Sequence, residues 1–250
     1  MRVLALVLVL ALTPAYAADS LYPVYAAGRY EEAIRAGSEA GTPEGLAIAA
    51  RAAMAEAAMR PAPCLSCLQR AEALARKSIA AGSLYPDGHI WLAAALGLEG
   101  RIQGVLRARA NVSVAKDELD AALRSDPRNA YALSAMGAWN IELVRGGGVL
   151  LAGLVYGAHE ADGLALFDRA VQAAPGNVAV RYQIALSLAG YDSRKFRSRI
   201  AGELEAAIQA TPQTEYEKFI QTRAATLQAL LNRGDEAALA EKVRLFQGYP

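Results

Sequence analysis

The sequence predicts an all-α protein built as an α-solenoid of antiparallel helix pairs, and three observations support this. The 250 residues are rich in Ala, Leu, Glu and Arg, which lose little side-chain freedom in a helix, while β-branched and aromatic residues are sparse. A pattern of apolar residues with helical spacing recurs along the chain. A proline follows each copy of the pattern. We therefore expect five or six helical hairpins and no strands.

The first residues have the layout of a secretory signal peptide. Arg2 is followed by an apolar run from Val3 to Leu12, then by Pro14 and a small-residue pattern at 15–17. This run is about half the length that a membrane-spanning helix needs. We expect residues 1–17 to be removed and residues 18–250 to form one helical repeat domain, with an uncleaved N-terminal anchor as the alternative. The mature protein is then periplasmic or secreted, without a transmembrane span.

The charge balance argues against a nucleic-acid partner. The chain carries 26 basic and 25 acidic side chains, and the two numbers become equal once Arg2 is removed with the signal peptide. A protein that neutralises phosphates needs an excess of Lys and Arg on one face. We therefore expect no nucleic acid among its partners.

The repeating unit has a small or aliphatic residue, a bulky residue four positions later, an alanine three after that, and a proline five further on. Spacings of four and three place the first three members on one helical face. The proline ends the helix because it lacks an N–H and clashes with the preceding turn. The three copies are Ala115, Leu119, Ala122 and Pro127; Gly163, Phe167, Ala170 and Pro175; and Ile200, Leu204, Ala207 and Pro212.

These segments resemble the tetratricopeptide repeat family, in which pairs of antiparallel helices recur about every 34 residues. The first helix of each pair in that family carries a glycine or alanine that lets the partner helix approach closely. Gly137 matches that position, Ala185 repeats it, and Gly97 is an earlier copy. The resemblance is best from Ala115 to Pro212. It implies a scaffold that binds another protein or a peptide through a concave groove.

Residues 145–158 lengthen one hairpin beyond the period of the family. The stretch from Val149 to Ala158 is almost wholly apolar, lies among glycines and is too short to cross a bilayer. We expect it to pack back on the solenoid as a buried lid, because apolar patches of this size are rarely exposed. It could instead line a pocket for an apolar ligand, or contact a membrane surface or a partner. Its candidate residues are Val149, Leu150, Leu151, Leu154 and Tyr156.

Cys64 and Cys67 are the only cysteines, and they precede an expected helix over 69–81. In an oxidising compartment they can form a structural disulfide, and a catalytic dithiol is the alternative. Thioredoxin-like chemistry needs this spacing after a strand, and we expect no strand. No hydrolase, phosphate-loop or metal-ligand motif is present. We therefore expect no enzyme activity, no metal and no cofactor.

The resemblance also implies which residues line the concave groove. Aligning the three first helices at Gly97, Gly137 and Ala185 gives two rows of side chains that face the concave surface in the family. The candidate groove residues are Trp91, Tyr131, Ser134 and Tyr182, with Arg101 and Glu142 near the wall. Trp91 and Tyr131 could instead pack between neighbouring hairpins.

Two further function classes stay open. The chain also resembles the tetratricopeptide-like partners of some solute transporters, which implies an accessory protein that binds a small apolar or amphiphilic ligand, with residues 145–158 lining the pocket. An enzyme that uses Cys64 and Cys67 is the third class.

Overall fold

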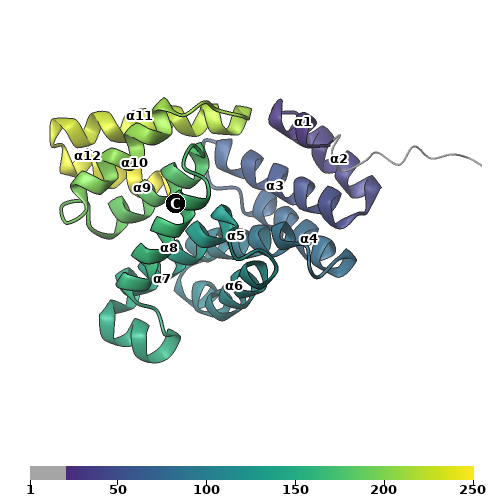
Figure 1. Ribbon diagram of the computed structural model, residues 1–250, viewed down its shortest axis with the longest axis horizontal. Helices are drawn as coiled ribbons and strands as arrows, with labels where there is room; N and C mark the ends of the chain where they lie inside the picture. Colours follow the sequence, from purple (N-terminus) through teal and green to yellow (C-terminus); the bar gives the residue numbers. More distant parts are fainter. Residues whose placement is uncertain (1–20) are drawn as a thin grey trace, which may run out of the picture.

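A computed structural model describes residues 21–250, and the expected signal peptide lies outside this range. The described chain has twelve α-helices, one π-helical turn and no strand, which confirms the all-α prediction (Figure 1). Helices that are adjacent in the sequence pack against each other as hairpins. The helices are α1 Leu21–Ala26, α2 Tyr30–Ala40, α3 Pro43–Met59, α4 Leu65–Ala81, α5 Pro86–Gln103, α6 Val105–Ser125, α7 Ala130–Leu151, α8 Glu160–Ala173, α9 Val178–Asp192, α10 Arg197–Gln209, α11 Glu215–Arg233 and α12 Glu236–Phe246, and the π-helical turn is Ala152–Tyr156.

The expected helix periodicity holds in each of the three repeat copies. The three members of every copy are buried, in α6, α8 and α10, and those other than Gly163 have exposed fractions between 0% and 6%. Each of these helices ends two or three residues before its proline. Local spacing therefore predicted both the buried face and the end of each helix.

Close approach of paired helices occurs at glycine, although not everywhere at the expected one. A Cβ added to Gly137 would lie 2.6 Å from the ring of Phe167, so α7 and α8 meet at this position as the resemblance implies. Gly97 is exposed, and a Cβ there would meet nothing within 4 Å. In α5 the close approach is at Gly100, where a Cβ would lie 2.8 Å from the Cα of Ala108. The expected anchor in α5 was therefore wrong by about one helical turn.

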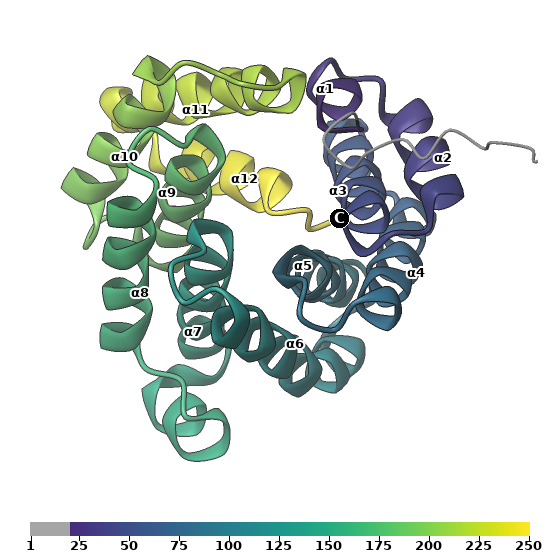
Figure 2. The same cartoon turned by 45° about the vertical axis from the view of Figure 1, so that its right-hand side comes forward.

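The hairpins curve until α11 lies beside α1 and contacts α3, so that they enclose a ring (Figure 2). Arg223 of α11 donates from Nη2 to the carbonyl oxygen of Ala58 in α3 at 2.9 Å. Tyr216 packs against both the N-terminal and the C-terminal core clusters. Helix α12 leads the C-terminus towards the centre of the ring. We call the side of α3, α5, α7 and α9 that faces this centre the interior face.

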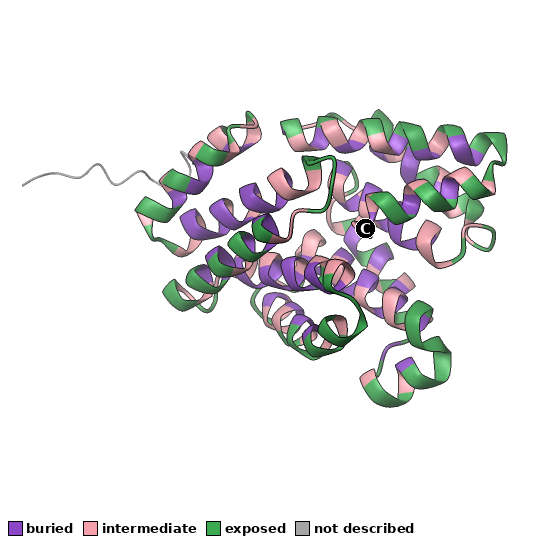
Figure 3. Cartoon of the chain, turned by 180° about the vertical axis from the view of Figure 1, so that it is seen from behind, coloured by how far each residue is buried: buried purple, intermediate pink, exposed green. Residues whose placement is uncertain are grey.

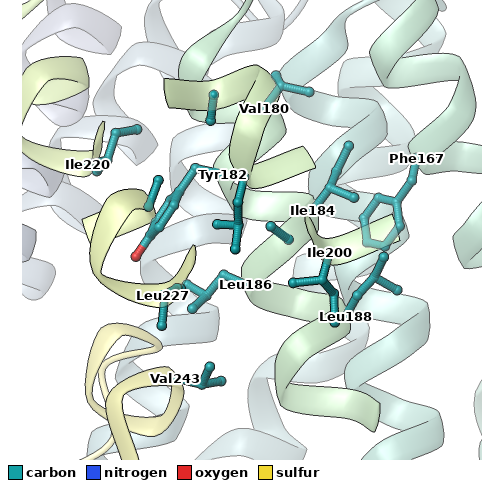
Figure 4. Close-up of a cluster of buried hydrophobic side chains, with 14 of the residues drawn as sticks. Phe167, Val180, Tyr182, Ile184, Leu186, Leu188, Ile200, Ile220, Leu227 and Val243 are labelled. Carbon is teal, nitrogen blue, oxygen red and sulfur yellow. The ribbon is translucent and has the colours of Figure 1, made fainter. Parts of the chain in front are cut away.

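The apolar core runs between the helices along the ring (Figure 3). Its largest cluster is shared by helices α7 to α12, and Figure 4 shows part of it. Phe167, Ile184, Ile200 and Leu204 are fully buried there. This continuous packing holds neighbouring hairpins at fixed angles, so the side chains of the interior face are held in fixed positions.

The segment 145–158 extends away from the ring, as the lower left of Figures 1 and 2 shows. Helix α7 continues to Leu151 across a non-helical Gly148, whose φ is 72°, and the π-helical turn follows. Leu150 and Leu154 are 80% and 86% exposed. The expected buried lid is therefore wrong, because helix α7 extends past the end of its hairpin and carries these side chains beyond the core.

The helical stretch Ala130–Tyr156 is long and apolar enough to cross a membrane by length and composition alone. Its first part packs in the ring, where Ile141 is fully buried. It also contains the ion pair between Glu142 and Arg145. Only the last part, from Val149 onward, exposes a continuous apolar surface.

Candidate functional site on the interior face

Arg51 of α3 lies on the interior face inside a group of aromatic rings. Its guanidinium carbon is 4.7 Å from the ring centre of Tyr25, 5.1 Å from that of Tyr131 and 5.3 Å from that of Trp91. Tyr22 lies slightly farther away, at 5.8 Å. Cations at such distances are attracted by the faces of aromatic rings. We call Arg51, Tyr25, Trp91 and Tyr131 the arginine cluster.

The helices bring this cluster together from distant parts of the sequence. Trp91 of α5 and Tyr131 of α7 have ring centres 5.9 Å apart, and both side chains are partly buried against neighbouring core residues. Asn129 caps α7 by accepting from the backbone N–H groups of Tyr131 and Ala132 at 3.1 Å. The cap positions Tyr131 at the first turn of its helix. Two of the expected groove residues therefore meet on the interior face.

Hydrogen bonds to Tyr131 join three helices at the arginine cluster. Arg51 donates from Nη2 to the Tyr131 hydroxyl oxygen at 2.9 Å. Asn177, the capping residue of α9, donates from Nδ2 to the same oxygen at 3.1 Å. The Tyr131 hydroxyl is therefore a node between α3, α7 and α9.

The cluster holds a permanent positive charge. Burial of the Arg51 guanidinium disfavours its charge, but Tyr25, Tyr131, Tyr22 and Asp87 favour it, and the pKa of Arg51 is raised above its usual value. Burial raises the pKa of Asp87, although Arg51 lowers it. Asp87 is the nearby acidic side chain, yet it forms no ion pair with Arg51 within the described chain.

The interior face also holds the C-terminal segment of the chain, residues 247–250. Arg101 of α5 donates from Nη1 to the backbone carbonyl oxygen of Gln247 at 2.7 Å. The Gln247 side chain donates from Nε2 to Glu142 Oε1 at 3.3 Å and to the carbonyl oxygen of Leu186 at 3.2 Å. Gln247 is only 3% exposed. The segment is therefore docked against α5, α7 and α9.

The Tyr249 ring adds contacts with two arginines that hold the C-terminal segment. Its ring centre is 5.6 Å from the guanidinium carbon of Arg101 and 5.4 Å from that of Arg145. Arg145 also donates to the Tyr249 hydroxyl and pairs with Glu142 at 2.5 Å. Arg101 Nη2 lies 3.5 Å from Glu142 Oε1, so these two side chains form an ion pair. The two residues expected at the groove wall are thus brought together, and the chain's own C-terminus covers them.

Ser134 and Tyr182 are not on the accessible surface. Their exposed fractions are 4% and 5%. The Ser134 hydroxyl donates to the carbonyl oxygen of Tyr131 in its own helix, at 3.0 Å. Tyr182 lies in the core with Ile220 and Leu227 of α11 (Figure 4). Their expected place along the groove is corrected, because the packing of α11 covers this side of α9.

The residues of the expected lid do not enclose a pocket. Val149, Leu150, Leu151 and Leu154 are between 49% and 86% exposed. Tyr156 is partly buried and packs against a small cluster formed by Val144, Ala152 and Ala158. The aliphatic side chains therefore face solvent on a convex tip.

An open cleft of about 860 Å³ lies between α2 and α4, away from the interior face. Its two arginines already have partners, since Arg70 pairs with Glu31 at 2.7 Å and Arg35 pairs with Glu39 at 3.4 Å. Exposed pairs of this kind are well solvated. We assign no ligand to this cleft.

Cys64 and Cys67 form the expected disulfide at the start of α4. Cys64 caps the helix, since its Sγ accepts from the backbone N–H of Cys67 at 3.2 Å. Within residues 21–250, no group of three or more His, Cys, Asp or Glu side chains is arranged to hold a metal ion.

Sequence reasoning missed Arg51, Asn177 and the C-terminal segment. Arg51 lies in an alanine-rich helix without a recognisable motif, and Gln247 and Tyr249 lie after the last helix. Asn177 carried the one local signal, because an asparagine before a helix predicts a cap. Its second role, as a donor to Tyr131, depends on how neighbouring hairpins pack.

The comparisons with known proteins leave the family open. No protein-family model matches the chain, and no curated protein matches it.

Proposed function

We propose that the protein is a binding scaffold whose interior face holds a short extended peptide of another protein. The observation that carries this proposal is the docking of the chain's own residues 247–250 on that face. A surface that already holds one peptide segment has the hydrogen-bonding groups that a second one would need. The proposal includes export, which the signal-like residues 1–17 support.

The contacts to the C-terminal segment combine two kinds of recognition. Arg101 binds a backbone carbonyl, which any residue can supply. Tyr249 lies against Arg101 and Arg145, and this contact requires an aromatic side chain. A partner that offers the same two features would compete with the C-terminus for the site. In this proposal the C-terminus protects the site until a partner displaces it.

A place within the tetratricopeptide repeat family is part of the same proposal. The hairpin arrangement and the close contact of Gly137 with Phe167 support it. The irregular register in α5 and the ring closure distinguish this chain from a regular array.

The test uses a synthetic peptide with the sequence of residues 245–250, labelled with a fluorophore. The protein is the full chain with Gln247→Ala and Tyr249→Ala, which removes the side-chain contacts of its own C-terminus. Fluorescence anisotropy should show saturable binding to this double variant and weaker binding to the unmodified chain, because the intact C-terminus competes. Adding Arg101→Met to the double variant should abolish binding.

A peptide with the same residues in scrambled order is the matched control. A folded double variant, checked by circular dichroism, that fails to bind the native peptide contradicts the proposal. Equal binding of the scrambled peptide also contradicts it, because it would show that the site does not select sequence.

A second candidate is the transporter-associated accessory protein that binds a small apolar or amphiphilic ligand. The exposed aliphatic side chains at 149–155 favour it, since a ligand that covers them would remove apolar surface from water. Native mass spectrometry of protein purified from its host would detect such a ligand as added mass. The mass should disappear in a Leu150→Ser, Leu154→Ser variant, and its persistence there would exclude the tip as the binding site.

A further inference from the structure

We propose that Arg51, Trp91 and Tyr131 form a subsite for an oxyanion, the carboxylate or phosphate group of a bound partner or ligand. The inference rests on the proposed function only in that the anion belongs to the bound molecule. Several hydrogen-bond donors meet at the arginine cluster.

Within residues 21–250, no acceptor lies in hydrogen-bonding contact with the proton of the Tyr131 hydroxyl. Its oxygen accepts from Arg51 at 2.9 Å and from Asn177 at 3.1 Å, which uses both of its lone pairs. The orientation of the Asn177 amide is set independently, because its Oδ1 accepts from the backbone N–H of Val180 at 2.9 Å. The Tyr131 O–H must therefore donate to a third group.

Arg51 and Trp91 add further unused donors. Within the described chain, Arg51 Nε and Trp91 Nε1 are buried and have no hydrogen-bond partner. The hydrogen bond from Nη2 to Tyr131 satisfies only one of the five N–H groups of the guanidinium. Buried donors without acceptors are costly, and a group that accepts from several of them would remove this cost.

The side chains around the cluster do not supply the missing acceptor. Asp87 favours the charged form of Arg51, but the two side chains form no ion pair among residues 21–250. The carboxylate of Glu217, which lies near Tyr22, accepts from the backbone N–H of Gln213 at 2.5 Å. The cluster therefore combines a fixed positive charge with several donors and too few acceptors.

The aromatic rings make the cluster suitable for binding an anion. They surround the guanidinium at 4.7–5.8 Å, and Arg51 is partly buried among them. A charge-assisted hydrogen bond is stronger in such an environment than in open solvent. Arg51, Trp91 and Tyr131 each keep part of their surface exposed, so a ligand can approach the cluster, and side-chain movements would bring the buried Arg51 Nε and Trp91 Nε1 into contact with it. An oxyanion supplies both the negative charge and the several lone pairs that the donors require.

The test uses Trp91 as the reporter. The chain has two tryptophans, so Trp139→Phe leaves Trp91 as the only one. The full-length single-tryptophan protein is titrated with cyclohexanecarboxylate, with the neutral cyclohexanecarboxamide and with inorganic phosphate, at constant ionic strength. We expect a saturable change in Trp91 emission with one or both anions and none with the carboxamide.

Two variants test the assigned residues. Arg51→Met should weaken anion binding at least tenfold, and Tyr131→Phe, which removes only the hydroxyl, should weaken it at least threefold. Arg35→Met, which removes an exposed arginine of the outer cleft, should leave it unchanged. Should Arg51→Met fail to fold by circular dichroism, Tyr131→Phe decides the assignment.

The outcomes separate the possible ligands and the two proposals. A response to the carboxylate alone identifies a carboxylate ligand, and a response to phosphate alone identifies a phosphoryl group. An equal response to the carboxamide, no response to either anion, or anion binding that neither variant weakens would overturn the subsite. The anion titration uses no peptide. Its result therefore does not depend on whether the peptide experiment succeeds, and the two proposals can fail separately.

Discussion

Arg101 on α5 donates from Nη1 to the backbone carbonyl oxygen of Gln247, a residue 146 positions later, at 2.7 Å. The same guanidinium lies 3.5 Å from Glu142 and near the ring of Tyr249. One side chain therefore connects the fifth helix, the seventh helix and the C-terminus across the ring.

Replacing Arg101 by Met should release residues 247–250 while keeping most of the side-chain length. The variant loses hydrogen bonds of a charged group, which contribute about 1.5–3 kcal/mol each when they are well made. We expect a loss of about 1–3 kcal/mol in the free energy of unfolding and faster hydrogen exchange at the C-terminus. Arg109→Met, which changes an exposed arginine, is the control. Unchanged exchange at residues 247–250 would show that Arg101 does not hold the segment.

Replacing Gly137 or Gly97 by alanine should change the free energy of unfolding in opposite directions. At Gly137 a new Cβ would lie 2.6 Å from the Phe167 ring, and overpacking of this kind costs about 1–3 kcal/mol. At Gly97 there is open space, and alanine should stabilise the helix by about 0.5–1 kcal/mol. Urea unfolding followed by circular dichroism measures both changes. A stabilising Gly137→Ala would contradict the close contact between α7 and α8.

Glu99 should make stability depend on pH. Its side chain is fully buried, and burial together with the neighbouring Glu72 carboxyl raises the pKa of Glu99 from 4.5 to about 7. Because the folded state binds this proton more tightly, the contribution of Glu99 to stability is fully present below pH 4.5 and is lost as the pH rises through about 7.

Glu99→Gln keeps the shape and removes this titration. The variant should exceed the unmodified chain in stability by about 1–2 kcal/mol at pH 8 and by much less at pH 4.5. Thermal unfolding at both pH values measures the difference. An equal effect at the two pH values would show that Glu99 ionisation does not cause it.

The disulfide between Cys64 and Cys67 should contribute modestly to stability. A cross-link that closes so short a loop removes little freedom from the unfolded chain, so a double Ser variant should lose about 1–2 kcal/mol. Peptide binding at the interior face should stay unchanged, because the disulfide lies at the start of α4. Loss of binding in a stably folded variant would instead give the cysteines a functional role.

The tip of the extended segment should tolerate polar substitution. Leu154 is 86% exposed, so Leu154→Ser should change the free energy of unfolding by no more than about 0.5 kcal/mol. Ile141→Ser in the same helix places a hydroxyl in the core and should cost several times as much. Chemical unfolding of both variants makes the comparison. A large cost at Leu154 would show that the tip packs against the ring after all.

Part of this structure could be predicted because its causes are local. Leu119, Phe167 and Leu204 are buried because apolar spacing of four and three creates one helical face, and Pro127, Pro175 and Pro212 follow the helices that end before them. The contact of Gly137 with Phe167 follows the same pattern. Trp91 and Tyr131 could be placed near each other because the relevant first helices are neighbours.

The other features depend on how helices that are far apart in the sequence pack together, and no local pattern determines this packing. The extension of 149–155 away from the core depends on where α7 leaves its partner helix, so the expected lid was wrong. Burial of Tyr182 depends on α11, which begins more than thirty residues later. The cluster around Arg51 requires α3, α5, α7 and α9 to meet, and its arginine has no sequence signal of its own.

The sequence by itself determined the helical class, the ends of the three helices that a proline follows, their buried stripes and the pairing of neighbours, because each depends on residues within about one or two turns of one another. Only the tertiary structure decided the closure of the ring, the docking of the C-terminus and the donors around Tyr131. These features depend on the summed rotations between successive hairpins, and small differences at each interface accumulate along the chain.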